Sequence, residues 1–547
     1  MVSRNPIGVV LTGATTQKAA CQLFESSERG GVREGKFLVI ESMPGKRQIM
    51  VRVAAIVPQN DFYSAGDAWT EARRKQVEIP GQLARQYEIC ELDLLAEMPG
   101  AKPIVVPPFP NDKIYEMKLP EEAENIFGVS KKSPGIIWYG TMVGYQNAPI
   151  PLNIESIPMH IGIFGTTGSG KSYDTGALIE QLVKICDKED RILSFPILII
   201  DANGDYLDYV KFFEDHEKFG AASAITRYVF PGSPELSKMN VRPIAIDLNL
   251  VSKREIAEAI NLYYSGGEKT ELQVTGVEKL IAHMEETSLI SEGNYQSIFT
   301  DDTKFEDAKG AISNLGLHSG TVAAVLRALE KFKGVEDNYN LLSEEPKLDR
   351  NFVDNMTKNR EIAIIDFSAA GAPGVDPPLK QFVMSYLASI LFRVFTQYKI
   401  EGQERYMLFI IEEAQNYCPN LATYNIGYSL AREKLAAIAT QGRKFGLSLC
   451  LISQRPSFVD QVVLSMCNSF FLHRISPEDV SFVKRVTGGL PLSLERRLTI
   501  LDNGELIVSG QMLTLPFPML VRVPPREVPQ TTGKTDVLGA LRRMAAK

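Results

Sequence analysis

Residues 160–184 read HIGIFGTTGSGKSYDTGALIEQLVK, and this stretch decides the fold. It begins with the short apolar run 160–164, continues through the glycine-rich segment 165–172, and ends in a helical pattern over 173–185. The middle segment, GTTGSGKS, matches the phosphate-binding pattern G-x-x-x-x-G-K-[ST] at every fixed position. A strand, a glycine loop and a helix in this order direct backbone N–H groups and a helix N-terminus at phosphate. The stretch therefore predicts a P-loop that binds ATP.

The P-loop prediction gives each residue of this segment a role. Lys171 is expected to reach the β- and γ-phosphates, and the Ser172 hydroxyl is expected to bind Mg²⁺. The glycines allow the backbone to wrap around the phosphates. The expected nucleotide-binding residues of the loop are Gly165, Thr166, Thr167, Gly168, Ser169, Gly170, Lys171 and Ser172.

Further short apolar runs predict the rest of an α/β core. Runs of this kind suit strands that are buried on both faces of a parallel sheet, with helices between them. One such helix is expected at 378–396, where apolar residues recur at helical spacing. The runs lie at 160–164, 196–200, 362–365, 406–411, 447–452 and 469–473.

The remaining segments predict additional parts around this core. Several short β-rich runs before residue 100 indicate a small N-terminal β-barrel or sandwich. The charged, helix-like segment after the second core strand is read as an insertion, and a proline-containing linker with a short amphipathic helix ends the chain. The expected division is 1–150 for the β-barrel domain, 151–205 for the first part of the core, 206–350 for the helical insertion, 351–522 for the second part of the core and 523–547 for the linker and helix.

Two adjacent carboxylates follow one of the apolar runs, in MLFIIEEAQ at 407–415. We expect Glu412 to hold the Mg²⁺ shell and Glu413 to polarise the attacking water. The alternative is a solvated acidic pair that opens a helix. The division of roles between the two glutamates stays open from the residues alone.

Polar residues follow two other predicted strands. DANGDY places Asp201 and Asp205 after one strand, and ISQRPS places Gln454 after another. Ligand sites of open α/β sheets lie at the carboxyl ends of the strands, so Asp201 and Asp205 are candidate nucleotide-binding residues and Gln454 is a candidate γ-phosphate sensor. As isolated features, such residues more often belong to turns.

Two basic segments have both a plain and a functional interpretation. In TQGRKFG at 440–446, Arg443 and Lys444 suit the last turn of a helix. Arg443 also fits an arginine finger that acts on the ATP of a neighbouring subunit. In the segment 420–434, Arg432 and Lys434 belong either to a DNA-binding pore loop or to an exposed helix.

Composition excludes several classes of protein. The chain has 547 residues and a formal net charge of −7, so it is not coated in DNA-binding charge, although a local basic channel remains compatible with it. The six cysteines and five histidines form no zinc-binding spacing. No apolar run reaches the length of a membrane span, which is about 18 residues. We expect a cytoplasmic protein without a membrane partner.

Taken together, the motifs GTTGSGKS, DANGDY, FIIEEAQ, GRKFGLSL and ISQRPS resemble the HerA branch of the HerA/FtsK P-loop ATPases. GVVLTGATTQ at 8–17 and GELIVSG at 504–510 are similar to the first and last β segments of that family. DANGDY departs from the more common D-P-H-G-E-Y of the family, which leaves the role of Asp205 open.

The resemblance implies a RecA-like core in a homohexameric ring that uses ATP and Mg²⁺ to move double-stranded DNA through its pore. It also implies a NurA-type nuclease partner that docks on the N-terminal barrel during DNA end resection and double-strand break repair. Within this pattern Glu413 is the catalytic glutamate, Gln454 the sensor and Arg443 the arginine finger. The alternatives are a related motor for DNA packaging, conjugation or antiviral defence, and a nucleotide-dependent ring scaffold that does not translocate.

Overall fold

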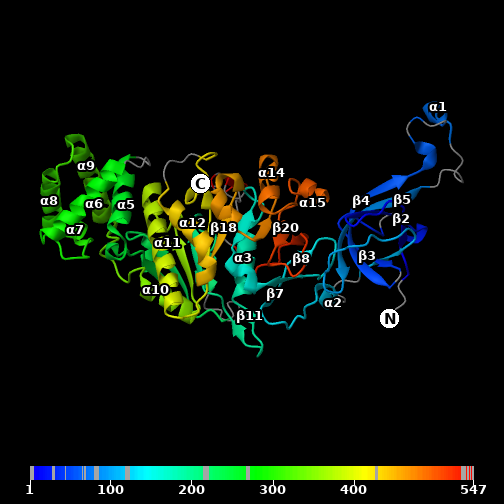
Figure 1. The fold of residues 1–547 in the computed structure, drawn as a ribbon, viewed down its shortest axis with the longest axis horizontal. Coiled ribbons are helices and arrows are strands. Elements are labelled where there is room, and N and C mark those ends of the chain that lie inside the picture. The colour runs from blue at the N-terminus through cyan, green and yellow to red at the C-terminus, as the bar shows by residue number, and fades with distance from the viewer. Residues whose placement is uncertain are drawn as a thin grey trace.

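The computed structural model places three parts in a row, with a β-barrel at one end, a large sheet in the middle and a helical lobe at the other end (Figure 1). The structure describes residues 5–27, 31–43, 45–64, 66, 69–78, 86–117, 123–212, 221–265, 271–424, 429–530, 538, 541, 542 and 544. Within this part of the chain, no helix has the length and apolarity that a membrane span requires.

The N-terminal part is a closed barrel with the strand order β1-β2-β5-β4-β3-β6, which confirms the predicted small β-barrel. Its interior is apolar, with Val10, Leu38, Ile40 and Val51 almost fully buried. β6 pairs with both β1 and β3 and so closes the barrel. The strands are β1 (Gly8–Val10), β2 (Lys18–Leu23), β3 (Phe37–Ser42), β4 (Arg47–Gln59), β5 (Tyr87–Met98) and β6 (Lys113–Glu116).

The segment after the barrel strands belongs to other sheets. β7 (Ile136–Tyr139) and β9 (Ile150–Asn153) pair with each other, and β8 (Thr141–Met142) joins the edge of the large sheet. The last barrel strand, β6, ends at Glu116, which lies well before the expected domain boundary at residue 150.

The central sheet has eleven strands in the order β15-β14-β16-β13-β17-β18-β10-β19-β20-β21-β8. The strands from β15 to β19 run parallel, and β20, β21 and β8 continue antiparallel. All six predicted core strands are present as parallel neighbours, so the α/β, RecA-like core is confirmed. The strands are β10 (Ile161–Phe164), β13 (Ile197–Asp201), β14 (Ile225–Val229), β15 (Val241–Pro243), β16 (Ile362–Asp366), β17 (Met407–Ile411), β18 (Leu447–Ser453), β19 (Ser469–Leu472), β20 (Glu505–Gly510) and β21 (Met519–Arg522).

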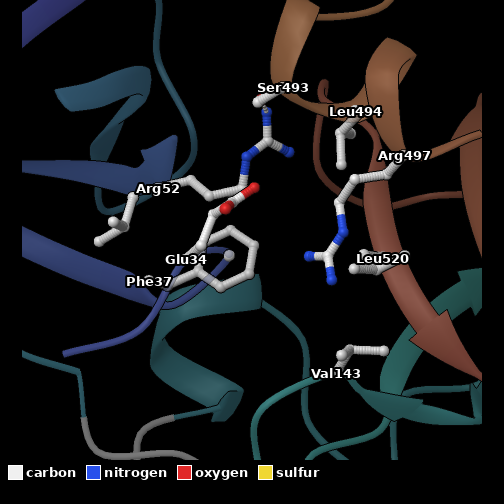
Figure 2. A pocket seen from close by; sticks show the side chains of 10 residues that line it. Glu34, Phe37, Arg52, Val143, Ser493, Leu494, Arg497 and Leu520 are labelled. Atoms are coloured by element: carbon white, nitrogen blue, oxygen red, sulfur yellow. Dashed lines mark hydrogen bonds between the residues drawn. The ribbon is translucent and has the colours of Figure 1, made fainter. Parts of the chain in front are cut away.

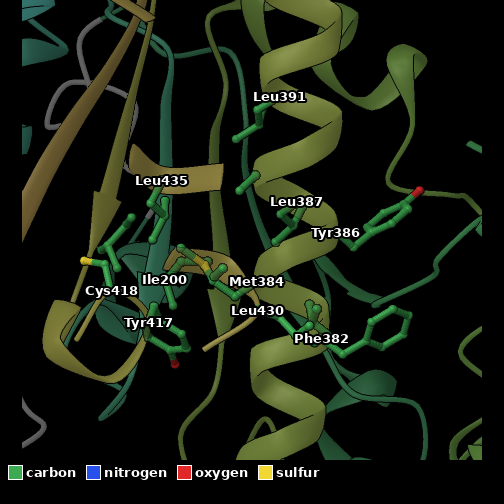
Figure 3. Packing of buried hydrophobic residues seen from close by; sticks show 14 of the residues in the cluster. Ile200, Phe382, Met384, Tyr386, Leu387, Leu391, Tyr417, Cys418, Leu430 and Leu435 are labelled. Atoms are coloured by element: carbon green, nitrogen blue, oxygen red, sulfur yellow. The ribbon is translucent and has the colours of Figure 1, made fainter. Parts of the chain in front are cut away.

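Helices cover both faces of this sheet. α11 (Pro377–Ile400) and α12 (Ala431–Gln441) pack on one face together with Ile200, and α3 (Lys171–Leu182) packs on the other face against Ile163. Figure 3 shows Phe382, Leu387 and Leu391 of α11 among the buried side chains of the first face. The apolar stripe predicted at 378–396 is thus core, as its helical spacing indicates.

The range 206–350 is mainly helical, but it also supplies β14 and β15 to the sheet, which the sequence analysis did not expect. The charged Arg227 interrupts the apolar pattern of β14, and it is buried because it pairs with Asp366 and Glu235. The helices of this range and its border are α4 (Leu207–Phe212), α5 (Lys253–Ser265), α6 (Glu271–Glu286), α7 (Ser297–Thr300), α8 (Asp302–Ala311), α9 (Ser319–Tyr339) and α10 (Arg350–Asn359).

The remaining elements are short and lie around the barrel and the core. They are α1 (Thr70–Arg74), α2 (Ala123–Phe127), β11 (Ile185–Cys186), β12 (Ile192–Leu193), α13 (Gln461–Ser465), α14 (Pro477–Val486) and α15 (Leu492–Arg497). α1 lies at the tip of the long β4–β5 hairpin, which projects away from the body of the protein (Figure 1).

A buried arginine joins the barrel to the core (Figure 2). Arg52 of β4 donates to Asp93 of β5 at 3.0 Å and, across the boundary, to the Ser493 hydroxyl of α15 at 3.3 Å. Burial lowers the pKa of Arg52, and the neighbouring Asp93 carboxylate opposes this shift. The contact fixes one side of the barrel against the end of the ATPase core.

The described tail residues 523–530 pack along α3. The Glu180 carboxylate of α3 accepts hydrogen bonds from the backbone N–H groups of Glu527 and Val528, and the Val528 side chain is fully buried. Of the expected C-terminal helix, the structure describes residues 538, 541, 542 and 544, which are helical and exposed. The rest of the expected helix lies outside the described residues.

Candidate active site

The P-loop connects β10 to α3 and is anchored to β19 and its following residues. Thr166 N donates to the Arg474 carbonyl at 2.8 Å, and a Cβ added at Gly165 would lie only 2.6 Å from Cβ of His473. Gly170 has a φ of 105°, which residues with a side chain rarely adopt. Lys171 Nζ donates to the Thr166 carbonyl at 3.0 Å. Burial lowers the pKa of Lys171, whereas Glu413, Glu412 and Asp205 oppose the shift.

The sheet brings the predicted site residues to one edge. In the parallel register Phe164 of β10 lies beside Ser453 of β18, and Ile411 of β17 lies beside both Leu451 and Ile200. The residues that follow these strands therefore meet at the carboxyl edge, where α/β sheets bind ligands.

One chain of hydrogen bonds runs from the P-loop to the predicted catalytic glutamate. The Thr167 hydroxyl donates to Oε1 of Gln454 at 2.6 Å, and Nε2 of Gln454 donates to Oε1 of Glu413 at 2.6 Å. The other oxygen of Glu413 accepts from Gln415, whose own oxygen accepts from the Ser453 hydroxyl at 2.8 Å. Both carboxylate oxygens of Glu413 are thus oriented by side-chain amides.

Glu412, the residue before Glu413, is almost fully buried, with an exposed fraction of 2%. Its oxygens accept from the Tyr206 hydroxyl at 3.0 Å and from Ala202 N at 3.3 Å. Burial raises the pKa of Glu412 well above its usual value, and the carboxylates of Asp201 and Asp205 add to the effect.

Asp201 and Asp205 take different positions after β13. The buried Asp201 carboxylate accepts hydrogen bonds from the backbone N–H groups of four residues, Asn203, Gly204, Asp205 and Tyr206. Its oxygens therefore shape the loop, and burial, assisted by Asp366, raises its pKa to about 7. Asp205 is only partly buried and accepts from Gln530 of the tail at 3.5 Å. Any contact of Asp201 with nucleotide is therefore expected to be indirect.

Arg443 lies at the opposite edge of the sheet, in a short 3-10 turn, η8 (Gly442–Phe445). The turn ends at Gly446, where an added Cβ would lie 1.9 Å from the Arg405 carbonyl oxygen. β18 separates the turn from the carboxyl edge and has seven residues. At about 3.3 Å per residue, Arg443 lies roughly 20 Å or more from the P-loop of its own chain. Its side chain is exposed.

The two candidate DNA-binding residues both form ion pairs. Arg432 Nε lies 2.9 Å from Asp460, and Lys434 Nζ lies 2.6 Å from Glu255. The side chains of Arg432 and Lys434 are 39% and 34% exposed, so solvent and other anions reach both pairs. Residues 425–428 of the proposed pore loop lie outside the described residues.

The site suits Mg²⁺ that binds together with the nucleotide rather than an ion that protein side chains hold alone. Within the described ranges, no group of three or more His, Cys, Asp or Glu side chains could hold a metal ion. Mg²⁺ in nucleotide sites uses few protein oxygens and takes its other ligands from phosphate and water. The Ser172 hydroxyl at the start of α3 and the Glu412 carboxylate have the oxygen chemistry that this ion prefers.

Three residues near the site escaped the sequence analysis. Tyr206 orients Glu412, Gln415 orients Glu413, and His473 lies beneath the P-loop. His473 is the last residue of the predicted strand 469–473 and is one of only five histidines, so its position at a strand end was an available signal. The two others become recognisable only when the contacts of the glutamates are known.

Comparisons with known proteins show which families and structures the chain resembles. Residues 137–391 match the family model described as "Helicase HerA, central domain". The "DNA double-strand break repair helicase HerA" of Saccharolobus solfataricus is 25% identical over 516 residues, which cover 93% of this chain and 91% of that protein. The protein of the same name from Sulfolobus acidocaldarius is 24% identical, over 93% and 92% of the two chains. A VirB4 structure from Thermoanaerobacter pseudethanolicus covers 73% of this chain and 98% of its own, with 13% identity and a TM-score of 0.49.

The fold and the site define a P-loop ATPase with a RecA-like core. The P-loop, the oriented glutamate and the glutamine between them meet at one edge of its sheet. Within this class, the chain is similar to HerA helicases, because residues 137–391 match the HerA central-domain model and two relatives of that name align over more than nine-tenths of both chains.

Proposed function

We propose that this chain is an ATP-driven motor that translocates or unwinds double-stranded DNA. The hydrogen-bonded chain from Thr167 through Gln454 to Glu413 carries the proposal, because it links the phosphate loop to an oriented carboxylate. In this arrangement Lys171 binds the phosphates of ATP and Glu413 polarises the attacking water. A site that only binds nucleotide needs the phosphate loop but has no need for an oriented carboxylate.

Ser172 and Glu412 are the residues that would hold Mg²⁺. The ion would supply positive charge to the phosphate oxygens. The hydrogen bonds from Tyr206 and Ala202 fix the direction of the Glu412 carboxylate, so this chain presents one oriented oxygen ligand at the carboxyl edge. Asp205, which is only partly buried, is proposed to lie near the nucleotide. Asp201 is proposed to act indirectly, by shaping the loop that carries Asp205.

We infer that the working form is a ring of several copies, with six as the expected number. Arg443 is exposed and lies far from the P-loop of its own chain, so we propose that it acts on the site of another copy. An arginine from a neighbour stabilises charge that develops on the transferred phosphoryl group.

DNA is the proposed substrate, and its phosphates are the expected contacts. The relatives are named DNA double-strand break repair helicases, which supports a role in repair, and end resection is the proposed step of that repair. Arg432 and Lys434 are the proposed contacts, because both cations are partly exposed and proteins bind duplex DNA largely through its phosphates. A NurA-type nuclease is the proposed partner, docked on the barrel.

DNA-stimulated ATP hydrolysis tests the proposed function. The full chain should hydrolyse MgATP faster in the presence of linear duplex DNA, and Lys171→Ala should abolish both the basal and the stimulated rates. A chain that binds ATP and assembles into rings without turnover would be a scaffold instead. A motor for packaging, conjugation or defence would show the same stimulation and differ in its partners.

Mixed rings test the role of Arg443. Arg443→Ala rings should bind ATP but lose most hydrolysis, and mixing them with Glu413→Gln subunits should restore part of the rate. Recovery is expected because some mixed interfaces combine an intact glutamate with an intact arginine. Full activity of the Arg443→Ala ring would refute the finger, and Lys444→Ala is the matched control on the adjacent exposed cation.

A further inference from the structure

A fully buried trio of polar side chains lies behind the P-loop, and the reaction described above does not use it. The trio comprises Tyr139, Asp174 and His473, each with an exposed fraction of 0%. Tyr139 comes from β7, Asp174 from the first helical turn after the P-loop, and His473 from the end of β19. Three elements that are distant in sequence thus meet at the base of the phosphate loop.

Two hydrogen bonds connect the trio, and the Asp174 carboxylate accepts both of them. The Tyr139 hydroxyl donates to Oδ1 of Asp174, and Nε2 of His473 lies 2.9 Å from Oδ2 of the same carboxylate. Because a carboxylate only accepts, Nε2 is the nitrogen that carries a proton. The backbone N–H of His473 donates to the Phe164 carbonyl at 2.8 Å, which fixes the residue to the strand that enters the P-loop.

The His473 side chain also limits where the P-loop can lie. A Cβ on Gly165 would lie 2.6 Å from Cβ of His473, and a Cβ on Gly170 would lie 3.8 Å from Nδ1. Gly165 therefore packs against Cβ of His473, and Gly170 lies near its imidazole ring. Nδ1 is buried and has no hydrogen-bond partner among the described residues. A buried polar atom without a partner costs free energy, so packing alone would favour an apolar side chain here.

We propose that His473 is a positioning residue for the phosphate-binding loop, which it holds through Asp174 on α3 and through its contact with Gly165. The hydrogen bond to Asp174 fixes the first turn of α3, and that turn carries Lys171 and Ser172. The proposal rests on the proposed ATPase function and adds a residue to its nucleotide site. His473 does not itself contact the reacting atoms.

Binding of a fluorescent methylanthraniloyl derivative of ATP to the full chain tests this role. His473→Phe keeps the volume but removes the donor, and the dissociation constant should rise about tenfold. His473→Gln places an amide N–H within reach of Asp174, so its dissociation constant should stay within about threefold of wild type. His473→Asn carries the same amide but is too short to reach Asp174, and it should bind about as weakly as His473→Phe.

A second-site change separates positioning from general packing. In His473→Phe the buried Asp174 carboxylate keeps only the Tyr139 hydroxyl as a side-chain donor. Adding Asp174→Asn replaces this carboxylate by a neutral amide, so most of the lost affinity should return. A packing defect would instead accumulate in the double variant. If His473→Phe does not fold, the comparison of the Gln and Asn variants carries the test alone. The matched control is His160→Phe, which removes another buried histidine at the opposite end of β10 and should leave the dissociation constant within about twofold of wild type.

The outcomes distinguish the two proposals. Equal affinity of His473→Gln and His473→Asn, or a double variant that binds no better than His473→Phe, would overturn the role of His473. A wild-type chain that does not bind the ATP derivative at all would overturn the proposed ATPase function instead.

Discussion

Replacing Gln454 by alanine should separate hydrolysis from nucleotide binding. The change removes the hydrogen bond that orients Oε1 of Glu413 and the one that joins Gln454 to the Thr167 hydroxyl. A hydrogen bond to a charged group contributes about 1.5–3 kcal/mol. If Glu413 loses that orientation in the transition state, kcat should fall about 10- to 150-fold. KM for ATP should change by less than about threefold, because the Thr167 hydroxyl can bond to water instead.

Steady-state ATP hydrolysis with saturating linear duplex DNA measures both constants. Gln454→Glu should be at least as inactive as Gln454→Ala, because it places a second carboxylate against Glu413. The matched control is Gln441→Ala, at an exposed position at the end of α12 that should leave both constants unchanged. A kcat that falls by less than about threefold in Gln454→Ala would refute the reasoning, since the loss of a useful bond to Glu413 must cost more. A large rise in KM with unchanged kcat would place Gln454 in binding rather than hydrolysis.

The remaining predictions concern stability and DNA binding. Burial lowers the pKa of His160 from 6.5 to about 4, so the unfolded chain takes up a proton at a higher pH than the folded chain. Stability should therefore fall as the pH drops through this window, by about 3 kcal/mol in total, and denaturation at several pH values should show a smaller loss in His160→Gln. Arg227→Met leaves Asp366 buried without its partner and should cost about 3–5 kcal/mol in the same denaturation assay, whereas an effect below about 1 kcal/mol would contradict the buried pair. Lys434→Ala should lower the slope of log affinity against log salt for duplex DNA by about one, and an unchanged slope in fluorescence anisotropy would exclude a phosphate contact at this residue.

The sequence predicts the core of the fold because its strands are buried on both faces and read as continuous apolar runs. β14 breaks this rule, since Arg227 is charged yet buried in a pair with Asp366 and Glu235. β6 is four residues long and contains Lys113, so its apolar signal is too short to recognise. Both strands are specified by partners that are remote in sequence.

The candidate site likewise contains some residues whose position the sequence predicts and others whose position it does not. Glu413 and Gln454 are predictable because each follows an apolar strand, and the parallel sheet brings the strand ends together. The role of Asp201 could not be read from its position, because its oxygens bind the backbone of its own loop. The contact of His473 with the P-loop could not be read from the sequence, because it depends on β19 lying beside β10 in the sheet.

ATP-dependent displacement of a third strand from duplex DNA tests most directly whether the chain is a motor. The full chain should release the third strand from a linear triplex in the presence of MgATP, but not with a non-hydrolysable ATP analogue and not in the Lys171→Ala variant. A chain that hydrolyses ATP and binds duplex DNA, yet leaves the triplex intact, would contradict the proposed translocation.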